Sequence, residues 1–198
     1  MNQDNNVNSN IIPVSEELLT TYEEELRLPK QTIDRAREIR NKAIKEDLTQ
    51  HRCYAAITAG IGLLACREQN IPRVASDFAE LTHNDGKEIT QHRVSQQSRR
   101  IKRELKIEIT PTPTEKYLNY YGTELGISEE TMLQAENMLE TAKEIGLTEK
   151  PAPPSIAAGI IDAARRITNE DIIQKDIENV SHVTATQFRQ YCQQIQTA

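Results

Sequence analysis

The chain has 198 residues, a length that allows one large domain or two domains of about 100 residues, each with its own core. Hydrophobic residues make up 37% of it and aromatic residues only 4%, so short aliphatic side chains must fill the interior, which favours helices. The formal net charge of −6 argues against a simple nucleic-acid coat protein, and no apolar run approaches the roughly 20 residues that span a bilayer. Because no basic and then apolar leader opens the chain, we expect a cytoplasmic protein that does not enter a membrane.

Few residues form a pattern that is typical of catalysis or of metal binding. The three cysteines, Cys53, Cys66 and Cys192, form no CxxC pair, so the sequence predicts no disulfide framework, no metal site and no cofactor. It contains no Gly-rich phosphate loop, no GxSxG motif and no Cys/His or paired-carboxylate constellation. We therefore expect a protein that is not an enzyme, in which acidic runs such as EELLTTYEEEL are solvated helix faces.

The first half of the chain predicts a polar tail at residues 1–12 and then a series of helices within 13–108. EELLTTYEEEL has apolar residues at helical spacing, and a second helix is expected at 32–46. The third, ITAGIGLLACRE at 57–68, is so rich in Ala and Gly that it should be a buried central helix with close neighbours. A short helix at 74–81 and a last one at 90–105 follow. Residues 87–106 carry seven basic and two acidic side chains, a local charge of +5 that could face phosphate.

The alternating Pro and Thr residues of ITPTPTEK predict an extended linker at 109–116. In the second half, 117–198, Ser128 is a candidate N-cap for a helix at 129–145 that ends before Gly146. The Ala-rich stretch IAAGIIDAARRI at 156–167 predicts another central helix. A short helix at 174–180, a tight polar turn and a last helix at 184–195 form the pattern of a helix-turn-helix motif.

The two Ala-rich stretches begin 99 residues apart, at Ile57 and Ile156, and the similarity continues far beyond them. At the same offset and without a gap, other positions pair residues of the same kind: Tyr22 with Tyr121, Leu26 with Leu125, Ala36 with Ala135, Ala43 with Ala142, Asn70 with Asn169. Helical patterning alone could bring one helix into phase, but not several helices together with their connections. The sequence therefore predicts a tandem duplication.

Two helical repeats that end in a helix-turn-helix resemble the core domain of archaeal transcription initiation factor B, the homologue of the general transcription factor IIB. The most specific stretches are LLACREQNIPR at 63–73, TEKYLNYYGTELGISEE at 114–130, and KEIGLTEKPAPPSIAAGII and QKDIENVSHVTATQFRQY further on. The resemblance implies an all-α fold of two tandem cyclin-like five-helix repeats. It also implies a monomer in the archaeal cytoplasm, associated with the nucleoid.

In that family the core binds the TATA-binding protein and the promoter DNA on both sides of the TATA box, and the helix-turn-helix enters the major groove. The resemblance places Thr186, Gln187 and Arg189 on the base-reading face and Arg52 near the downstream groove, while Thr184 could meet phosphate. A solvated surface arginine is the alternative interpretation of Arg189. The family's zinc ribbon, which docks on RNA polymerase, is not matched here, so we do not expect a polymerase contact; such a core could modulate or repress initiation.

The last helix of the first repeat has two possible registers, because the segment THNDGKEITQHR is about five residues longer than the family's turn needs. Either the helix starts at Lys87 and Glu88, which keeps the offset of 99 and pairs Ile89 with Phe188, or it matches the family from Val94. The second register places Arg99, Arg100 and Arg103 along the helix as candidate DNA contacts. A cyclin-fold module that binds proteins without contacting DNA is the alternative function.

Overall fold

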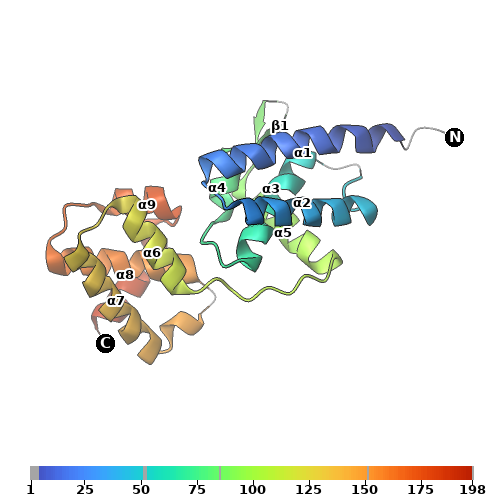
Figure 1. The fold of residues 1–198 in the computed structure, drawn as a ribbon. Coiled ribbons are helices and arrows are strands. Elements are labelled where there is room, and N and C mark those ends of the chain that lie inside the picture. The colour runs from blue at the N-terminus through green and yellow to red at the C-terminus, as the bar shows by residue number, and fades with distance from the viewer. Residues whose placement is uncertain (1–4, 51–52, 85, 151, 198) are drawn as a thin grey trace. The chain divides into compact units, whose positions relative to one another are not determined.

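The computed structural model describes residues 5–50, 53–84, 86–150 and 152–197, and the chain divides into two compact units, Met1–Pro111 and Thr112–Ala198 (Figure 1). Within the described residues the first unit contains five α-helices and a short antiparallel hairpin: α1 (Asn5–Glu25), α2 (Lys30–Lys45), α3 (Tyr54–Glu68), α4 (Ala75–Glu80), β1 (His83–Asn84), β2 (Lys87–Glu88) and α5 (Gln91–Glu104). Helix α1 begins at Asn5, inside the segment for which the sequence predicts a polar tail.

The second unit, over its described residues, contains another five α-helices and one 3-10 turn: α6 (Thr114–Leu125), α7 (Glu129–Glu144), η1 (Leu147–Glu149), α8 (Pro153–Thr168), α9 (Gln174–Ser181) and α10 (Ala185–Gln196). The predicted all-α fold of two five-helix repeats, the second ending in a helix-turn-helix, is therefore confirmed. None of the described helices is long and apolar enough to cross a membrane.

The helix starts repeat at the interval that the sequence predicts. Helices α2, α3 and α4 begin at residues 30, 54 and 75, and α7, α8 and α9 begin at 129, 153 and 174, so each pair is 99 residues apart. The turns between them repeat as well, because left-handed residues occur at matching positions: Arg27 with Gly126, Asp47 with Gly146, and Asn70 with Asn169. The helices and the turns that end them are therefore both repeated at the same interval, as expected for a tandem duplication.

Helices α3 and α8 form the centres of the two cores. Every residue of α3 from Ala55 to Cys66 is buried, as is every residue of α8 from Ile156 to Ala164. The prediction of buried central helices is confirmed, and one glycine in each explains the close packing. A Cβ atom on Gly60 would lie 2.7 Å from the backbone nitrogen of Ser98 in α5, and one on Gly159 would lie 3.0 Å from that of Cys192 in α10. The last helix of each unit is thereby placed directly on the central one.

The structure decides between the two registers of the last helix in the first unit. Helix α5 begins at Gln91 after the N-cap Thr90, whereas Lys87 and Glu88 form strand β2, so the register that starts the helix at those residues is wrong. The buried residues of the two last helices correspond at a spacing of 94: Val94, Gln97, Ser98 and Ile101 with Phe188, Tyr191, Cys192 and Ile195. The five extra residues of the first repeat are therefore taken up by the β1–β2 hairpin.

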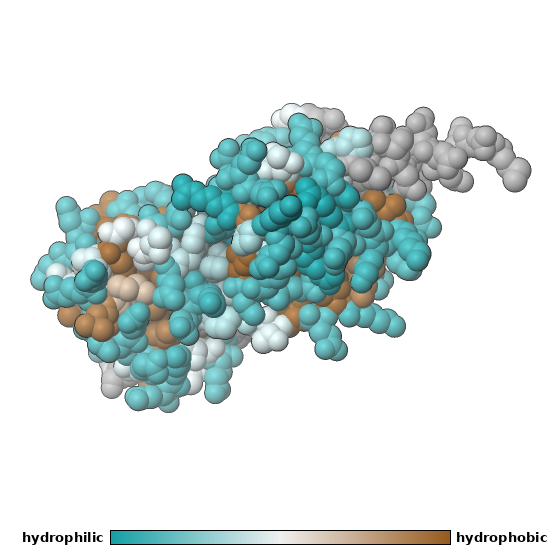
Figure 2. All heavy atoms as spheres, in the orientation of Figure 1, coloured by the Kyte–Doolittle hydropathy of each residue, from teal (hydrophilic) through white to brown (hydrophobic). Residues whose placement is uncertain are grey.

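The visible surface is mainly hydrophilic, with apolar side chains in smaller patches (Figure 2). Among the described residues, the large apolar side chains that remain exposed are Val14, Leu133, Ile145, Ile167 and Ile173. Isolated apolar residues of this kind are normal on a folded surface.

Candidate nucleic-acid interface

Helices α9 and α10 are joined by a tight turn that sets the start of α10. His182 adopts a left-handed backbone conformation (φ 52°) directly after α9. The Glu178 carboxylate then accepts a hydrogen bond from the backbone N–H of Ala185, the first residue of α10. This backbone hydrogen bond holds the pKa of Glu178 below its usual value. A charged group of the first helix thus satisfies one of the free N–H groups of the second.

The predicted contact residues of α10 share an exposed surface. Thr184, Thr186, Gln187 and Arg189 are all exposed, whereas Phe188 between them is fully buried against the core. Side chains three and four positions apart lie on one helix face. Because Phe188 faces the core, the residues next to it in the sequence face away from the core. The structure thus brings these four predicted residues together at the N-terminal end of one helix.

Two of these residues also cap the helix. The Gln187 side-chain oxygen Oε1 accepts hydrogen bonds from the backbone N–H and from the hydroxyl of Thr184, both at 3.1 Å. This is the reciprocal half of a capping box, in which the third helical residue reaches back to the N-cap. Gln187 therefore uses its acceptor oxygen within the protein, and only its Nε2 group is left to donate to a base or a phosphate.

Arg189 is tied to the preceding helix. Its Nη2 atom donates to Oε1 of Gln174, the first residue of α9, at 2.7 Å. The Nε2 atom of Gln174 donates in turn to Oδ2 of Asp162 in α8, at 3.1 Å. A continuous chain of hydrogen bonds thus connects an exposed arginine of α10 to the core of the unit.

Asp162 is fully buried and is surrounded by donors. Nε and Nη2 of Arg165 donate to its Oδ1 at 2.9 and 2.6 Å, and Nη2 of Arg166 donates to its Oδ2 at 2.7 Å. Burial raises the pKa of Asp162, but the hydrogen bonds from Gln174 and the two arginines outweigh it, so this pKa lies below its usual value. The sequence interpretation missed Asp162 and Gln174. A lone acid within the apolar run GIID, with arginines three and four residues later, is the signal that could have indicated a buried ion pair.

Helix α5 presents basic side chains along its whole length, from Arg93 in its first turn to Arg103 in its last. Arg99 and Arg103 are exposed and Arg100 is partly buried, and all three line one pocket of about 440 Å³ together with His92, Gln96 and Gln97. The structure thus brings these three predicted residues together, although Arg103 is also paired with Glu104 at 2.7 Å. The predicted contact Arg52 lies outside the described residues.

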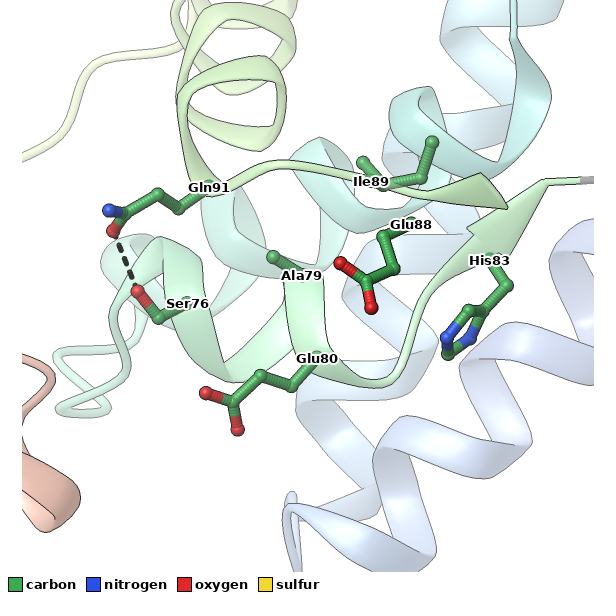
Figure 3. Close-up of a pocket in the computed structure, with 7 residues that line it drawn as sticks. All are labelled: Ser76, Ala79, Glu80, His83, Glu88, Ile89 and Gln91. Atoms are coloured by element: carbon green, nitrogen blue, oxygen red, sulfur yellow. Dashed lines mark hydrogen bonds between the residues drawn. The ribbon is translucent and has the colours of Figure 1, made fainter. Parts of the chain in front are cut away.

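The pocket in front of α5 has a more acidic lining. A pocket of about 320 Å³ lies between α4, the hairpin and the first residue of α5, and its polar lining includes Glu80, His83 and Glu88 (Figure 3). At its edge the Ser76 hydroxyl donates to Oε1 of Gln91 at 2.7 Å. The two carboxylates of this pocket disfavour a nucleic-acid phosphate there, whereas the arginines along α5 favour one.

Comparisons with known proteins agree with this architecture. Residues 15–95 match the family model for the transcription factor TFIIB repeat, a cyclin-like all-α fold. Transcription initiation factor IIB 3 of Halobacterium salinarum is 33% identical over 172 residues, which are 86% of this chain and 53% of the relative. Transcription initiation factor IIB of Sulfurisphaera tokodaii is 33% identical over 164 residues, 83% of this chain and 52% of the relative. The chain thus spans about half the length of the curated relatives that it matches. The chain therefore carries a match to the transcription factor TFIIB repeat at residues 15–95 and is similar to transcription initiation factors IIB over most of its length, in agreement with its duplicated five-helix units and final helix-turn-helix.

Proposed function

We propose that this chain is the promoter-binding part of a transcription initiation factor, and that it binds the TATA-binding protein together with the DNA that flanks the TATA box. The observation that carries the proposal is the outward face of α10, where Arg189 is exposed and held in place at the N-terminal half of a helix-turn-helix. In such motifs this part of the second helix lies in the major groove. The names of the relatives, all transcription initiation factors, support the same assignment.

Arg189 is the residue to which we assign base reading. A guanidinium group that donates to both O6 and N7 of a guanine discriminates against other bases by about 1–3 kcal/mol. Thr186 lies at the same end of α10 and can donate its hydroxyl hydrogen bond to a phosphate oxygen, whereas the Thr184 hydroxyl must first leave Gln187 to do so. Gln187 acts mainly as the cap that orients this turn.

We assign a different role to α5 in the first unit. In the register that the structure shows, Arg99, Arg100 and Arg103 correspond to Gln193, Gln194 and Thr197, well beyond the turn that carries Arg189. Their positive charges attract phosphate whatever the base sequence is. The first unit therefore adds affinity, and the second unit adds sequence preference. Separate roles fit the division of the chain into the units Met1–Pro111 and Thr112–Ala198, with α6 beginning at Thr114 inside the predicted linker 109–116.

A protein-binding module that does not contact DNA is the second candidate, and one observation favours it. Residues 107–150 carry nine glutamates and three lysines, a local charge of −6, and most of these glutamates lie on the exposed side of α7. Such a face repels phosphate and suits a basic protein partner.

A gel shift with TATA-box DNA, with and without the TATA-binding protein, distinguishes the two candidates. We expect a supershift when both proteins are present, and a loss of about tenfold in affinity for the preferred sequence in Arg189→Ala. Gln196→Ala, an exposed change at the far end of α10, serves as the matched control and should leave binding unchanged. No supershift at any salt concentration would favour the protein-binding module, and a supershift insensitive to Arg189→Ala would overturn the assignment of base reading.

A further inference from the structure

We infer that Gln174 is a positioning residue that determines sequence preference by holding the Arg189 guanidinium in one orientation. The inference rests on the proposed function and extends it to a residue of α9, the first helix of the motif. Gln174 is half-buried, and its amide lies between the buried carboxylate of Asp162 and the exposed guanidinium of Arg189.

The chemistry of the two neighbours determines which way the amide points. An ionised carboxylate only accepts hydrogen bonds and a guanidinium only donates them, whereas a glutamine amide has one end of each kind. Nε2 of Gln174 must therefore face Asp162, at 3.1 Å, and Oε1 must face Arg189, at 2.7 Å. The reverse orientation would place two acceptors together on one side and two donors together on the other.

The carboxylate that orients the amide is itself held firmly. Arg165 donates to Asp162 through Nε and Nη2, and its third donor group, Nη1, donates to the backbone oxygen of Ile172 at 3.0 Å. Ile172 lies in the segment just before α9. The same arginine thus fixes the carboxylate in α8 and the chain that leads into α9, so Gln174 starts from a determined position.

The corresponding positions of the first repeat carry residues that cannot form this chain of hydrogen bonds. Leu63 stands 99 residues before Asp162, Ala75 stands 99 residues before Gln174, and Ser95 stands 94 residues before Arg189 in the register of the last helices. The arrangement is therefore a feature of the second repeat, the one to which we assign base reading.

Holding an arginine in place before it binds reduces the conformational entropy that it loses on contact with a base. An immobilised long side chain loses enough entropy to weaken a contact by about threefold to tenfold. We therefore expect Gln174→Met, which keeps the length and removes both hydrogen bonds, to lower discrimination between the preferred base pair and a substituted one by about that factor. Gln174→Lys keeps a donor for Asp162 but has no acceptor for Arg189, so it should lower discrimination as well.

The experiment measures the affinity of the full chain, with the TATA-binding protein, for TATA-box duplexes that differ at single base pairs beside the box. The readout is the ratio of affinities for the best and the substituted duplex. It is measured for the natural chain, Gln174→Met, Gln174→Lys, Arg189→Ala and the double variant of Gln174→Met with Arg189→Ala, and Gln196→Met is the matched control. In the Arg189→Ala background, Gln174→Met should have no further effect, since a positioning residue acts only through its partner.

The outcomes separate the inference from the function on which it rests. If Arg189→Ala leaves the ratio unchanged, the assignment of base reading to Arg189 fails, and the inference fails with it. If Arg189→Ala lowers the ratio but both Gln174 variants keep it, the inference alone is wrong. An equal loss on replacing Gln174 in the presence and in the absence of Arg189 would also overturn it, because such a loss indicates a general structural effect. If Gln174→Met fails to fold, the ratio of affinities measured for Gln174→Lys tests the inference instead.

Discussion

Asp162 is a single buried residue that links α8 to α9 and, through Gln174, to Arg189 of α10. Its side chain has no exposed surface, and it accepts hydrogen bonds from Arg165 and Arg166 of its own helix and from Gln174 of α9. A carboxylate that is buried without partners would be strongly destabilising, but one that is fully paired stabilises the arrangement that pairs it. The low pKa of Asp162 makes that contribution measurable by titration.

We expect Asp162→Asn to lower the free energy of unfolding by about 1–3 kcal/mol at pH 7. The folded-state pKa of Asp162 lies below the unfolded value of about 4, so the stabilisation is fully present above pH 4 and is lost as the pH falls through the folded-state pKa. Urea unfolding from pH 7 to pH 2 should therefore show the natural chain and the variant becoming steadily more alike below pH 4. Asp171→Asn, an exposed change nearby, is the control. A difference that stays constant over the whole range would contradict the role of this charge.

At the scale of the helices, the two repeats place different residues at the same left-handed position of one turn. Arg27 follows α1 in a left-handed conformation (φ 49°), and Gly126 occupies the same place after α6 (φ 61°). A side chain in this region is strained by its Cβ atom, whereas glycine adopts it without that cost. Arg27 is exposed, so little packing is lost when its side chain is removed.

We therefore expect Arg27→Gly to raise the free energy of unfolding of the first unit by about 0.5–1 kcal/mol, and Gly126→Arg to lower that of the second by a similar or larger amount. Thermal and urea unfolding of the two variants measure both effects. Lys42→Gly, which places a glycine at an exposed position inside α2, should instead be destabilising. A loss of stability in Arg27→Gly would show that the left-handed conformation is not the source of strain.

Apart from α1, which begins at Asn5 inside the predicted polar tail, most helices could be predicted from the sequence to within a few residues, because the duplication shows each helix twice. Gly146 and Ser128 mark the limits of α7 through ordinary cap chemistry, and the Ala and Gly of α3 and α8 indicate burial. The start of α5 could not be settled in the same way. Five extra residues break the interval of 99, and a hairpin of two-residue strands leaves no clear periodic pattern.

The candidate interface could be predicted only in part, for a reason of the same kind. The exposed face of α10 follows from helical spacing around Phe188. The hydrogen bonds from Arg189 through Gln174 to Asp162 join residues of three helices, and no local pattern relates such residues before the chain has folded. The capping role of Gln187 depends in a similar way on a side-chain conformation that helical spacing leaves open.

At the scale of the whole molecule, the proposed DNA binding requires a local concentration of positive charge, because the protein as a whole is acidic. The net charge is −6, yet residues 87–106 carry a local charge of +5, and three arginines of this run line one pocket along α5. At ordinary salt concentrations, charges more than about 10 Å away are largely screened. A phosphate next to α5 would therefore respond mainly to the arginines of α5 and little to the acidic surface elsewhere. Each phosphate contact then releases counterions and makes binding salt-dependent.

We expect the triple variant Arg99→Gln, Arg100→Gln and Arg103→Gln to reduce the slope of log affinity against log salt concentration by about 2–3, since each phosphate contact contributes about 0.9. Its ratio of affinities for preferred and substituted duplexes should not change, because phosphates carry no base identity. The matched control removes three charges from exposed residues away from α5, in Arg27→Gln, Lys42→Gln and Lys45→Gln. Fluorescence anisotropy from 50 to about 300 mM salt measures the slopes. An equal change of slope in both triple variants would mean that net charge, and not the α5 pocket, governs affinity. A changed ratio of affinities in the α5 variant would mean that this helix contacts bases.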